Sequence, residues 1–319
     1  MLQKMIPLIA FLLTFCALIL LLKTNLANFA LDTPNHRSLH TKAIPRTGGL
    51  ALMLGVLGGL CLLGMWLWVA LVLALLLVSL LDDILNLPVY WRFAAHLLAA
   101  AIFIWFFMSQ SSWWMMILAI LALVWMANLY NFMDGSDGLA GGMGAFGFAA
   151  YALAAQWAGD AQLVSLCACV SAVCLAFLRF NFHPAKIFMG DAGSIPLGFL
   201  SGAMGMYGWQ HMLWPIWFPV LVFSPFIVDA TATLFKRALR GEKVWQAHRL
   251  HYYQRLIQMG WGHKKTALVE YILMLSIAIC ALVMLRLPYL WVVLLLSLWL
   301  VIYFFIMLKI DKLWKQRLP

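Results

Sequence analysis

The sequence predicts an all-α, polytopic membrane protein with about eleven transmembrane helices. Of its 319 residues, 66% are hydrophobic and only 10% are charged, and the mean hydropathy is +0.96. Soluble globular domains are only about half apolar, so a water-soluble fold is excluded. The apolar segments have the length of membrane-spanning helices, whereas the strands of a membrane barrel are shorter and alternate in polarity. We therefore expect one integral membrane domain over residues 1–319.

Each expected span is a run of apolar residues that ends at a polar or glycine-containing stretch. The division of 50–81 is the least obvious, because this run is too long for one span and must turn near Gly64 and Trp66. We expect the spans at 5–22, 47–64, 66–81, 92–108, 113–129, 139–157, 162–178, 195–209, 213–233, 267–285 and 289–308.

The basic residues predict the orientation of the chain in the membrane. If the first loop is cytoplasmic, all but Lys4 and Arg286 of the 21 lysines and arginines lie on the cytoplasmic side, as the positive-inside rule requires. The N-terminus is then outside and the C-terminus is cytoplasmic. The predicted cytoplasmic loops are 23–46, 82–91, 130–138, 179–194 and 234–266.

Four polar residues recur at every third position near the end of the fifth span. Asn128, Asn131, Asp134 and Asp137 therefore lie along one slowly drifting face of a helix or tight helical turn. Polar groups at membrane depth are costly and so point to function. This face is suited to hold a cation or a polyhydroxyl ligand.

Further carboxylates fall at the same membrane face. Asp82 and Asp83 end the third span, and Asp191 lies between Gly190 and Gly193 in the loop before the eighth span. Taken alone, the first pair is an ordinary solvated helix end and the second stretch an ordinary turn. Their coincidence at one face, beside basic loops, predicts a metal-assisted site for an anionic substrate, with Asp82 and Asp191 as ligands of Mg²⁺.

Two basic loops supply candidate contacts for phosphate or sugar. In the segment 236–266, Arg249 and His251 are close enough in sequence to neutralise a diphosphate together. A topology anchor or a contact with anionic lipid explains this loop equally well. In the loop 32–49 the candidates are Arg37, His40 and Arg46, and a plain connecting loop is the alternative.

These motifs resemble those of the polyprenyl-phosphate N-acetylaminosugar-1-phosphate transferases, also called glycosyltransferase family 4. The likeness runs from about Asp32 to about Gly262. It rests on four ordered stretches: Asp-x-Pro-Asn-x-Arg-Ser-x-His at 32–40 with Pro-Arg-x-Gly-Gly at 45–49, Asp-Asp at 82–83, the stretch 128–138, and Phe-Met-Gly-Asp-Ala-Gly-Ser at 188–194.

The resemblance implies transfer of a sugar 1-phosphate from a UDP-N-acetylaminosugar to undecaprenyl phosphate at the cytoplasmic face of a bacterial inner membrane, with release of UMP. It implies that Asp82 and Asp83 activate the acceptor and bind metal, and that Asp191 binds Mg²⁺, with Mn²⁺ as the alternative ion. It also implies that Asn131, Asp134 and Asp137 line the pocket for nucleotide and metal. A one-step transfer and a covalent aspartyl intermediate both remain open.

The chain departs from the family in its last large loop. Many members carry Asp-Arg-x-His-x-His-His there, whereas this chain reads His-Arg-Leu-His-Tyr-Tyr-Gln at 248–254, with Tyr253 and Gln254 in place of the paired histidines. The chain therefore resembles the initiators of O-antigen, capsule and related glycans, which serve lipopolysaccharide or cell-wall biogenesis, more than the muramyl-pentapeptide transferase. The sugar stays open.

Two rival functions remain at this stage, a transporter or flippase for an anionic solute and a membrane scaffold without activity. A transporter places ionisable groups near the bilayer midplane and often has repeated halves, whereas here the charges gather at one face. The expected partners are the lipid bilayer, undecaprenyl phosphate and a UDP-sugar. We expect no nucleic acid as a partner, and a homodimer stays open.

Overall fold

The computed structural model describes residues 2–24, 27, 30–32, 43–85, 87–246 and 248–317. Within these ranges the chain is predominantly α-helical, as the sequence predicts. The described residues also contain a two-stranded antiparallel pairing of β1 (Leu31–Asp32) with β2 (Ile44–Pro45), in the register Leu31 to Pro45 and Asp32 to Ile44.

Short turns join most of the helices. The first half of the chain contains α1 (Leu2–Lys23), α2 (Gly48–Leu62), α3 (Trp66–Leu85), α4 (Val89–Met108), α5 (Trp113–Phe132) and α6 (Leu139–Ala158). The second half contains α7 (Ala161–Asn181), α8 (Asp191–Gln210), α9 (Trp217–Val222), α10 (Ser224–Leu239), α11 (Tyr252–Leu256), the π-helical turn η2 (Ile257–Trp261), α12 (Gly262–Met284) and α13 (Tyr289–Lys315).

Seven helical stretches of the described chain are long and apolar enough to cross a membrane, so the protein is a multi-pass membrane protein. They are residues 3–23 of α1, then α3, α4, α5, α7, the continuous stretch Tyr252–Met284, and α13. The predicted number of eleven is not confirmed. Helix α2 has only 15 residues, and the glycine-rich helices α6 and α8 do not satisfy the same criterion of length and hydropathy.

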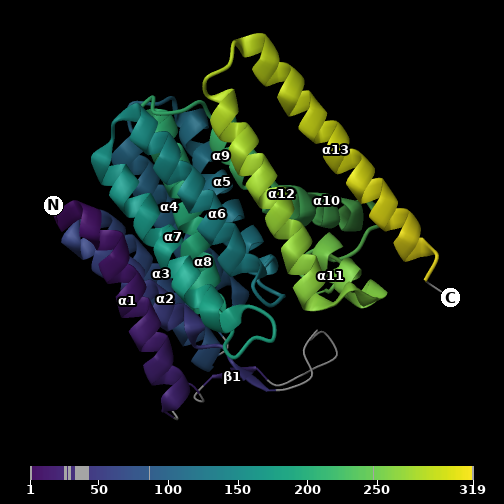
Figure 1. Ribbon diagram of the computed structural model, residues 1–319, viewed down its shortest axis with the longest axis horizontal. Helices are drawn as coiled ribbons and strands as arrows, with labels where there is room; N and C mark the ends of the chain where they lie inside the picture. The colour runs from purple at the N-terminus through teal and green to yellow at the C-terminus, as the bar shows by residue number, and fades with distance from the viewer. Residues whose placement is uncertain are drawn as a thin grey trace.

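The prediction of one span over 213–233 is wrong. The structure divides this segment into the six-residue α9 and the separate α10, which meet at Phe223. Pro225 lies in the first turn of α10 and lacks an N–H, so a continuous helix through this point would lose a hydrogen bond and meet a steric clash. In Figure 1, α10 accordingly runs across the direction of the neighbouring long helices.

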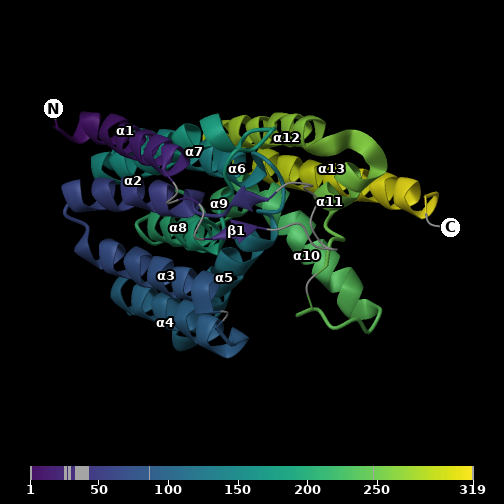
Figure 2. The same ribbon diagram turned by 90° about the horizontal axis from the view of Figure 1, so that it is seen from below.

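The long helices run roughly alongside one another. Helices α1 to α8 form one group, and α12 and α13 lie on the side of this group that is away from α1 (Figures 1 and 2). Within the first group α6 packs on α7, α1 on α7, and α5 on α8. Glycine also permits a close approach of α2 to α8, because a Cβ on Gly49 of α2 would lie only 2.3 Å from the backbone N of Gly193 in α8. The beginnings of α2 and α8 are thereby held side by side.

Backbone hydrogen bonds fasten the loop before α8 to the chain that leads from β2 into α2. The Phe188 N–H donates to Pro45 O at 2.8 Å, and the N–H groups of Gly48 and Gly49 donate to Phe188 O and Met189 O at 2.9 Å each. The loop 186–190 and the segment 45–49 therefore lie side by side at one end of the helix bundle. Asp82, Asp83, Asn131, Asp134 and Asp191, which the sequence analysis singled out, lie at this end.

Candidate functional site

Arg92, at the beginning of α4, joins carboxylates from two other helices. Its Nη1 donates to Asp82 Oδ2 of α3 at 2.7 Å and lies 3.7 Å from Asp191 Oδ2 of α8. Asp82 is buried, whereas the side chains of Arg92 and Asp191 are 32% and 28% exposed. A single guanidinium thus holds together two carboxylates that are more than a hundred positions apart in the sequence.

The C-terminal end of α5 fixes the orientation of Asp191. The Asn131 Nδ2 donates to Asp191 Oδ1 at 2.8 Å and also lies 3.0 Å from Ser194 Oγ, while the Ser194 hydroxyl donates to Gly190 O at 3.1 Å. Asn131 therefore lies beside Asp191, the predicted metal ligand. One oxygen of Asp191 remains toward Arg92.

A second guanidinium approaches Asp83. The Arg46 Nη1 lies 3.8 Å from Asp83 Oδ1, and the Asp83 side chain is only 7% exposed. Asp83 also interacts electrostatically with Asp191 and Asp82. Arg46 reaches this position because its own N–H bonds to Ala30 O at 2.8 Å, which continues the pairing of β1 with β2. Arg37 and His40, predicted in the same loop, lie outside the described residues.

Asp134 joins the same group from the loop that follows α5. The Gly190 N–H donates a hydrogen bond to its carboxylate, and Asp191 is close enough to act on it electrostatically. Burial raises the pKa of Asp134 well above its usual range, the negative charge of Asp191 raises the pKa further, and the Gly190 hydrogen bond opposes both. This carboxyl therefore favours a nearby positive charge or retention of its proton.

Asp137 lies at the edge of the group, between two histidines. Its Oδ2 is 2.7 Å from His183 Nδ1 and accepts from the Ala185 N–H at 3.1 Å, while Oδ1 is 3.7 Å from His263 Nδ1. The two imidazole rings stack with an interplanar angle of 7°. Asp137 thus ties the start of α12 to the loop between α7 and α8.

Three further predicted site residues, Asn128, His251 and Arg249, have other surroundings than the carboxylate group. The Asn128 Nδ2 donates to Val124 O within its own helix at 2.7 Å and lies 3.4 Å from His96 Nδ1 of α4. His251 is buried with its Nδ1 3.3 Å from Asp229 Oδ1. The Arg249 side chain is exposed.

Tyr253 and Gln254, which replace the family's paired histidines, have structural partners. The Tyr253 hydroxyl donates to Phe132 O at 3.1 Å, and Gln254 Oε1 accepts from the His251 N–H at 3.2 Å. Asp229 of α10 accepts from the N–H groups of Tyr252 and Tyr253 at 2.9 and 3.0 Å. These bonds satisfy free N–H groups at the start of α11 and hold this helix against the end of α5.

The sequence reasoning missed Arg92, His183 and His263 as members of this group. It counted Arg92 only as a cytoplasmic charge, although a signal was present. A helical hairpin with a short turn between 85 and 89 brings the last turn of α3 beside the first turn of α4, which places Arg92 near Asp82. For the two histidines the sequence holds no comparable local signal, since 80 residues separate them.

The donor chemistry of this group suits magnesium. Carboxylate and amide oxygens, here from Asp82, Asp134, Asp191 and Asn131, are the ligands that Mg²⁺ prefers. Across the described part of the chain, however, no three His, Cys, Asp or Glu side chains are arranged as a metal-binding group. The positive charge between Asp82 and Asp191 is supplied by Arg92.

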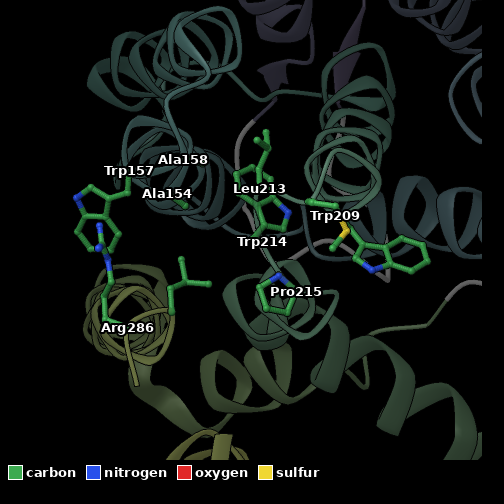
Figure 3. Close-up of a pocket in the computed structure, with 10 residues that line it drawn as sticks. Ala154, Trp157, Ala158, Trp209, Leu213, Trp214, Pro215 and Arg286 are labelled. Carbon is green, nitrogen blue, oxygen red and sulfur yellow. The ribbon is translucent and has the colours of Figure 1, made fainter. Parts of the chain in front are cut away.

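A pocket of about 430 Å³ opens at the opposite end of the bundle, between the ends of α6, α8 and α12. Figure 3 shows Arg286 beside the ring of Trp157, and the guanidinium carbon lies 5.0 Å from the ring centroid. Trp209 and Trp214 also line the pocket. This pocket contains none of the predicted site residues.

The fold and the site together define a helical membrane protein with clustered carboxylates and guanidinium groups at one end of its bundle. The sequence model of the family described as glycosyl transferase family 4 matches residues 65–208 of this chain. A probable undecaprenyl-phosphate N-acetylglucosaminyl 1-phosphate transferase of Bacillus subtilis is 30% identical, over 80% of this chain and 77% of the relative. The chain therefore belongs to glycosyl transferase family 4, the polyprenyl-phosphate N-acetylaminosugar-1-phosphate transferases, and is a transferase.

Two further relatives with similar sequences are named for different activities. A decaprenyl-phosphate N-acetylglucosaminephosphotransferase of Mycobacterium tuberculosis is 28% identical, over 76% of this chain and 72% of the relative. A phospho-N-acetylmuramoyl-pentapeptide-transferase of Moorella thermoacetica is 32% identical, but over only 54% of this chain and 53% of the relative. The resemblance inferred from the motifs is confirmed at the level of the family.

Proposed function

We propose that this protein transfers an N-acetylaminosugar 1-phosphate from a UDP-sugar to undecaprenyl phosphate and releases UMP. The product is a lipid diphosphate sugar that begins a cell-surface glycan such as O-antigen or capsule. The reaction takes place at the cytoplasmic face of a bacterial inner membrane and depends on Mg²⁺. The observation that supports it most is the convergence of Asp82, Asp83 and Asp191 with two arginines, with Asp134 close to Asp191.

The arrangement suits phosphoryl transfer, which depends mainly on positioning and on electrostatic stabilisation. An oxygen of the lipid phosphate attacks the sugar-bearing phosphorus and forms the new P–O bond. The bond from that phosphorus to the oxygen bridging the two phosphates of the donor breaks, and UMP leaves with the electron pair. The anomeric bond of the sugar stays intact. In this proposal Arg92 and Arg46 neutralise phosphate charge, and Asp83 orients the acceptor.

Asp191 and Asp82 would hold Mg²⁺, and Asn131 orients Asp191 for this role through its 2.8 Å hydrogen bond. When bound, the ion supplies charge neutralisation at the diphosphate. Asn131, which also donates to Ser194, restricts the rotation of the Asp191 side chain, so that the second oxygen of Asp191 stays directed toward Arg92. Because Asp191 is already oriented, less free energy is needed to bring the negatively charged groups together during the reaction.

The proposal is tested with purified protein in lipid nanodiscs, supplied with undecaprenyl phosphate, Mg²⁺ and a panel of UDP-N-acetylsugars. The panel includes UDP-N-acetylmuramyl-pentapeptide, and UMP release is followed. We expect UMP with at least one donor, a dependence on Mg²⁺, and a loss of about 100-fold or more in Asp191→Asn, the size typical of removing a transition-state electrostatic contact.

The matched control is Asp160→Asn, which makes the same change of carboxylate to amide at the other end of the bundle. Asp160 accepts from the Leu163 N–H at the start of α7, and asparagine keeps an oxygen for this bond. This variant should retain wild-type activity. Full activity of Asp191→Asn would refute the assigned role, and accumulation of a solute in proteoliposomes without UMP would favour the transporter.

A further inference from the structure

The pocket of about 430 Å³ at the end of the bundle opposite the carboxylate group contains a cation that the proposed function does not use. Arg286 lies in the turn after α12 and is one of the two basic residues that the sequence analysis placed at this face. Its guanidinium carbon lies 5.0 Å from the centroid of the Trp157 ring, and Figure 3 shows the two side chains together at one side of the pocket. Across the described residues no carboxylate forms an ion pair with Arg286. An aromatic ring therefore holds this arginine in place while its charge stays uncompensated.

The side chains that line the pocket offer hydrogen-bond donors and no carboxylate, amide or hydroxyl. Besides Arg286, the polar groups are the indole N–H groups of Trp157, Trp209 and Trp214, and the other lining side chains are apolar. The Trp214 N–H already donates to Gly205 O at 3.0 Å. Indole and guanidinium groups donate hydrogen bonds and accept none. The lining is therefore complementary to an anion.

The surroundings of the pocket are those of a membrane interface. Tryptophan is enriched at the depth of the lipid headgroups, and three tryptophans line this pocket. Exposed apolar residues continue from the pocket along two helices that pack on each other: Leu153 lies one turn before Trp157 on α6, and Val283 lies in the last turn of α12. Both are 51% exposed. An anion with apolar chains thus finds a contact for each of its parts.

We propose that this pocket binds the phosphate group of an anionic phospholipid, such as phosphatidylglycerol, in the leaflet opposite the carboxylate group. The phosphate oxygens accept from the Arg286 guanidinium, the tryptophan rings contact the headgroup, and the acyl chains follow the exposed surface of α6 and α12. A soluble anion has no chains to cover this apolar surface. A zwitterionic lipid brings a second cation close to Arg286, which repels it. None of the predicted site residues lines the pocket, so this binding is separate from the transfer reaction.

The test counts phosphatidylglycerol molecules bound to delipidated protein in detergent by native mass spectrometry. We expect the Kd for phosphatidylglycerol to rise roughly tenfold in Arg286→Gln, the size typical of losing one charge-assisted hydrogen bond at a partly exposed site, and to rise less in Arg286→Lys, which keeps the charge. The matched control is Lys4→Gln, which removes the same charge from the same face at an exposed position outside the pocket and should leave the Kd unchanged. An unchanged Kd in Arg286→Gln, or equal affinity of the wild type for phosphatidylcholine, would overturn the inference.

A second measurement leaves Arg286 in place. A benzophenone amino acid is introduced at Ala158, which lines the pocket, or at Gln156, which is exposed on the same turn of α6 and does not line it. The protein is then irradiated in nanodiscs that contain labelled phosphatidylglycerol. We expect crosslinking at position 158 that unlabelled phosphatidylglycerol reduces and glycerol 3-phosphate does not. Equal crosslinking at both positions would show unspecific contact with the bilayer, and competition by glycerol 3-phosphate would show a site for a soluble anion; either result would contradict the phospholipid assignment.

Discussion

Replacement of Arg92 by glutamine removes the cation that Asp82 and Asp191 share. A hydrogen bond between charged groups, such as the 2.7 Å bond to Asp82, contributes about 1.5–3 kcal/mol. The attraction to Asp191 at 3.7 Å would add about 4 kcal/mol at an effective dielectric constant of about 20. Because the Arg92 side chain is 32% exposed, water screens much of the second contribution. We expect Arg92→Gln to lower the free energy of unfolding by about 2–3 kcal/mol.

The assay is thermal unfolding of the purified protein in detergent, followed with a thiol-reactive dye. Cys167, Cys169 and Cys174 are buried and become reactive only on unfolding. A loss of about 2 kcal/mol should lower the Tm of a chain of 319 residues by roughly 3 °C. In a double-mutant cycle, Asp82→Asn should recover part of the loss, with a coupling of at least about 1 kcal/mol. A Tm equal to that of the wild type, or a coupling near zero, would show that Arg92 does not hold these carboxylates.

Three further predictions concern the loops around the site. Gly190 has φ +68°, and a Cβ there would lie 2.6 Å from Arg46 O, so Gly190→Ala should lower the free energy of unfolding by about 2–3 kcal/mol and remove most of the activity. The control is Gly159→Ala, at a position with φ +85° and open space around it. Equal losses of stability in both variants would contradict the steric argument. The pKa of Asp134 is raised above the ordinary 3.8, so kcat/KM should rise with pH through a value above 3.8, because only the ionised carboxylate attracts a cation. A higher Mg²⁺ concentration should shift this rise in kcat/KM to lower pH. If the rise does not shift with Mg²⁺, Asp134 does not interact with the ion. Asp229→Ala removes the acceptor at the start of α11 and should lower stability by about 1–2 kcal/mol, measured as Tm, whereas an unchanged Tm would show that water replaces this cap.

The helices were largely predictable because the apolar runs are separated by short turns with distinct residues. Gly64 has φ +70° and lies in the turn between α2 and α3, where the sequence predicted a turn. Prediction was wrong at 213–233, where hydrophobicity is continuous but Pro225 begins a new helix. A hydropathy pattern records how apolar a segment is and does not record a change in its direction.

The candidate site was predictable in composition and only partly in its contacts. The sequence placed Asp82, Asp83, Asp134 and Asp191 at one face, and the structure brings them together. The regular spacing of Asn128, Asn131, Asp134 and Asp137 suggested a common face, yet Asn128 contacts His96 and Asp137 contacts His183. The helix ends at Phe132, so the later members of the series follow the path of a loop.

By itself, the sequence determined that this chain is a helical membrane protein and that it carries the polar motifs of its family. Both are properties of local composition and order, which need no knowledge of how helices pack. Only the tertiary structure decided which charges meet. Arg92 reaches Asp191, and the Gly190 N–H reaches Asp134, because the close contact of α2 with α8 and the pairing of the loop 186–190 with 45–49 fix three helix ends in one place. Electrostatic energy depends on these distances through space, and spacing along the chain does not specify them.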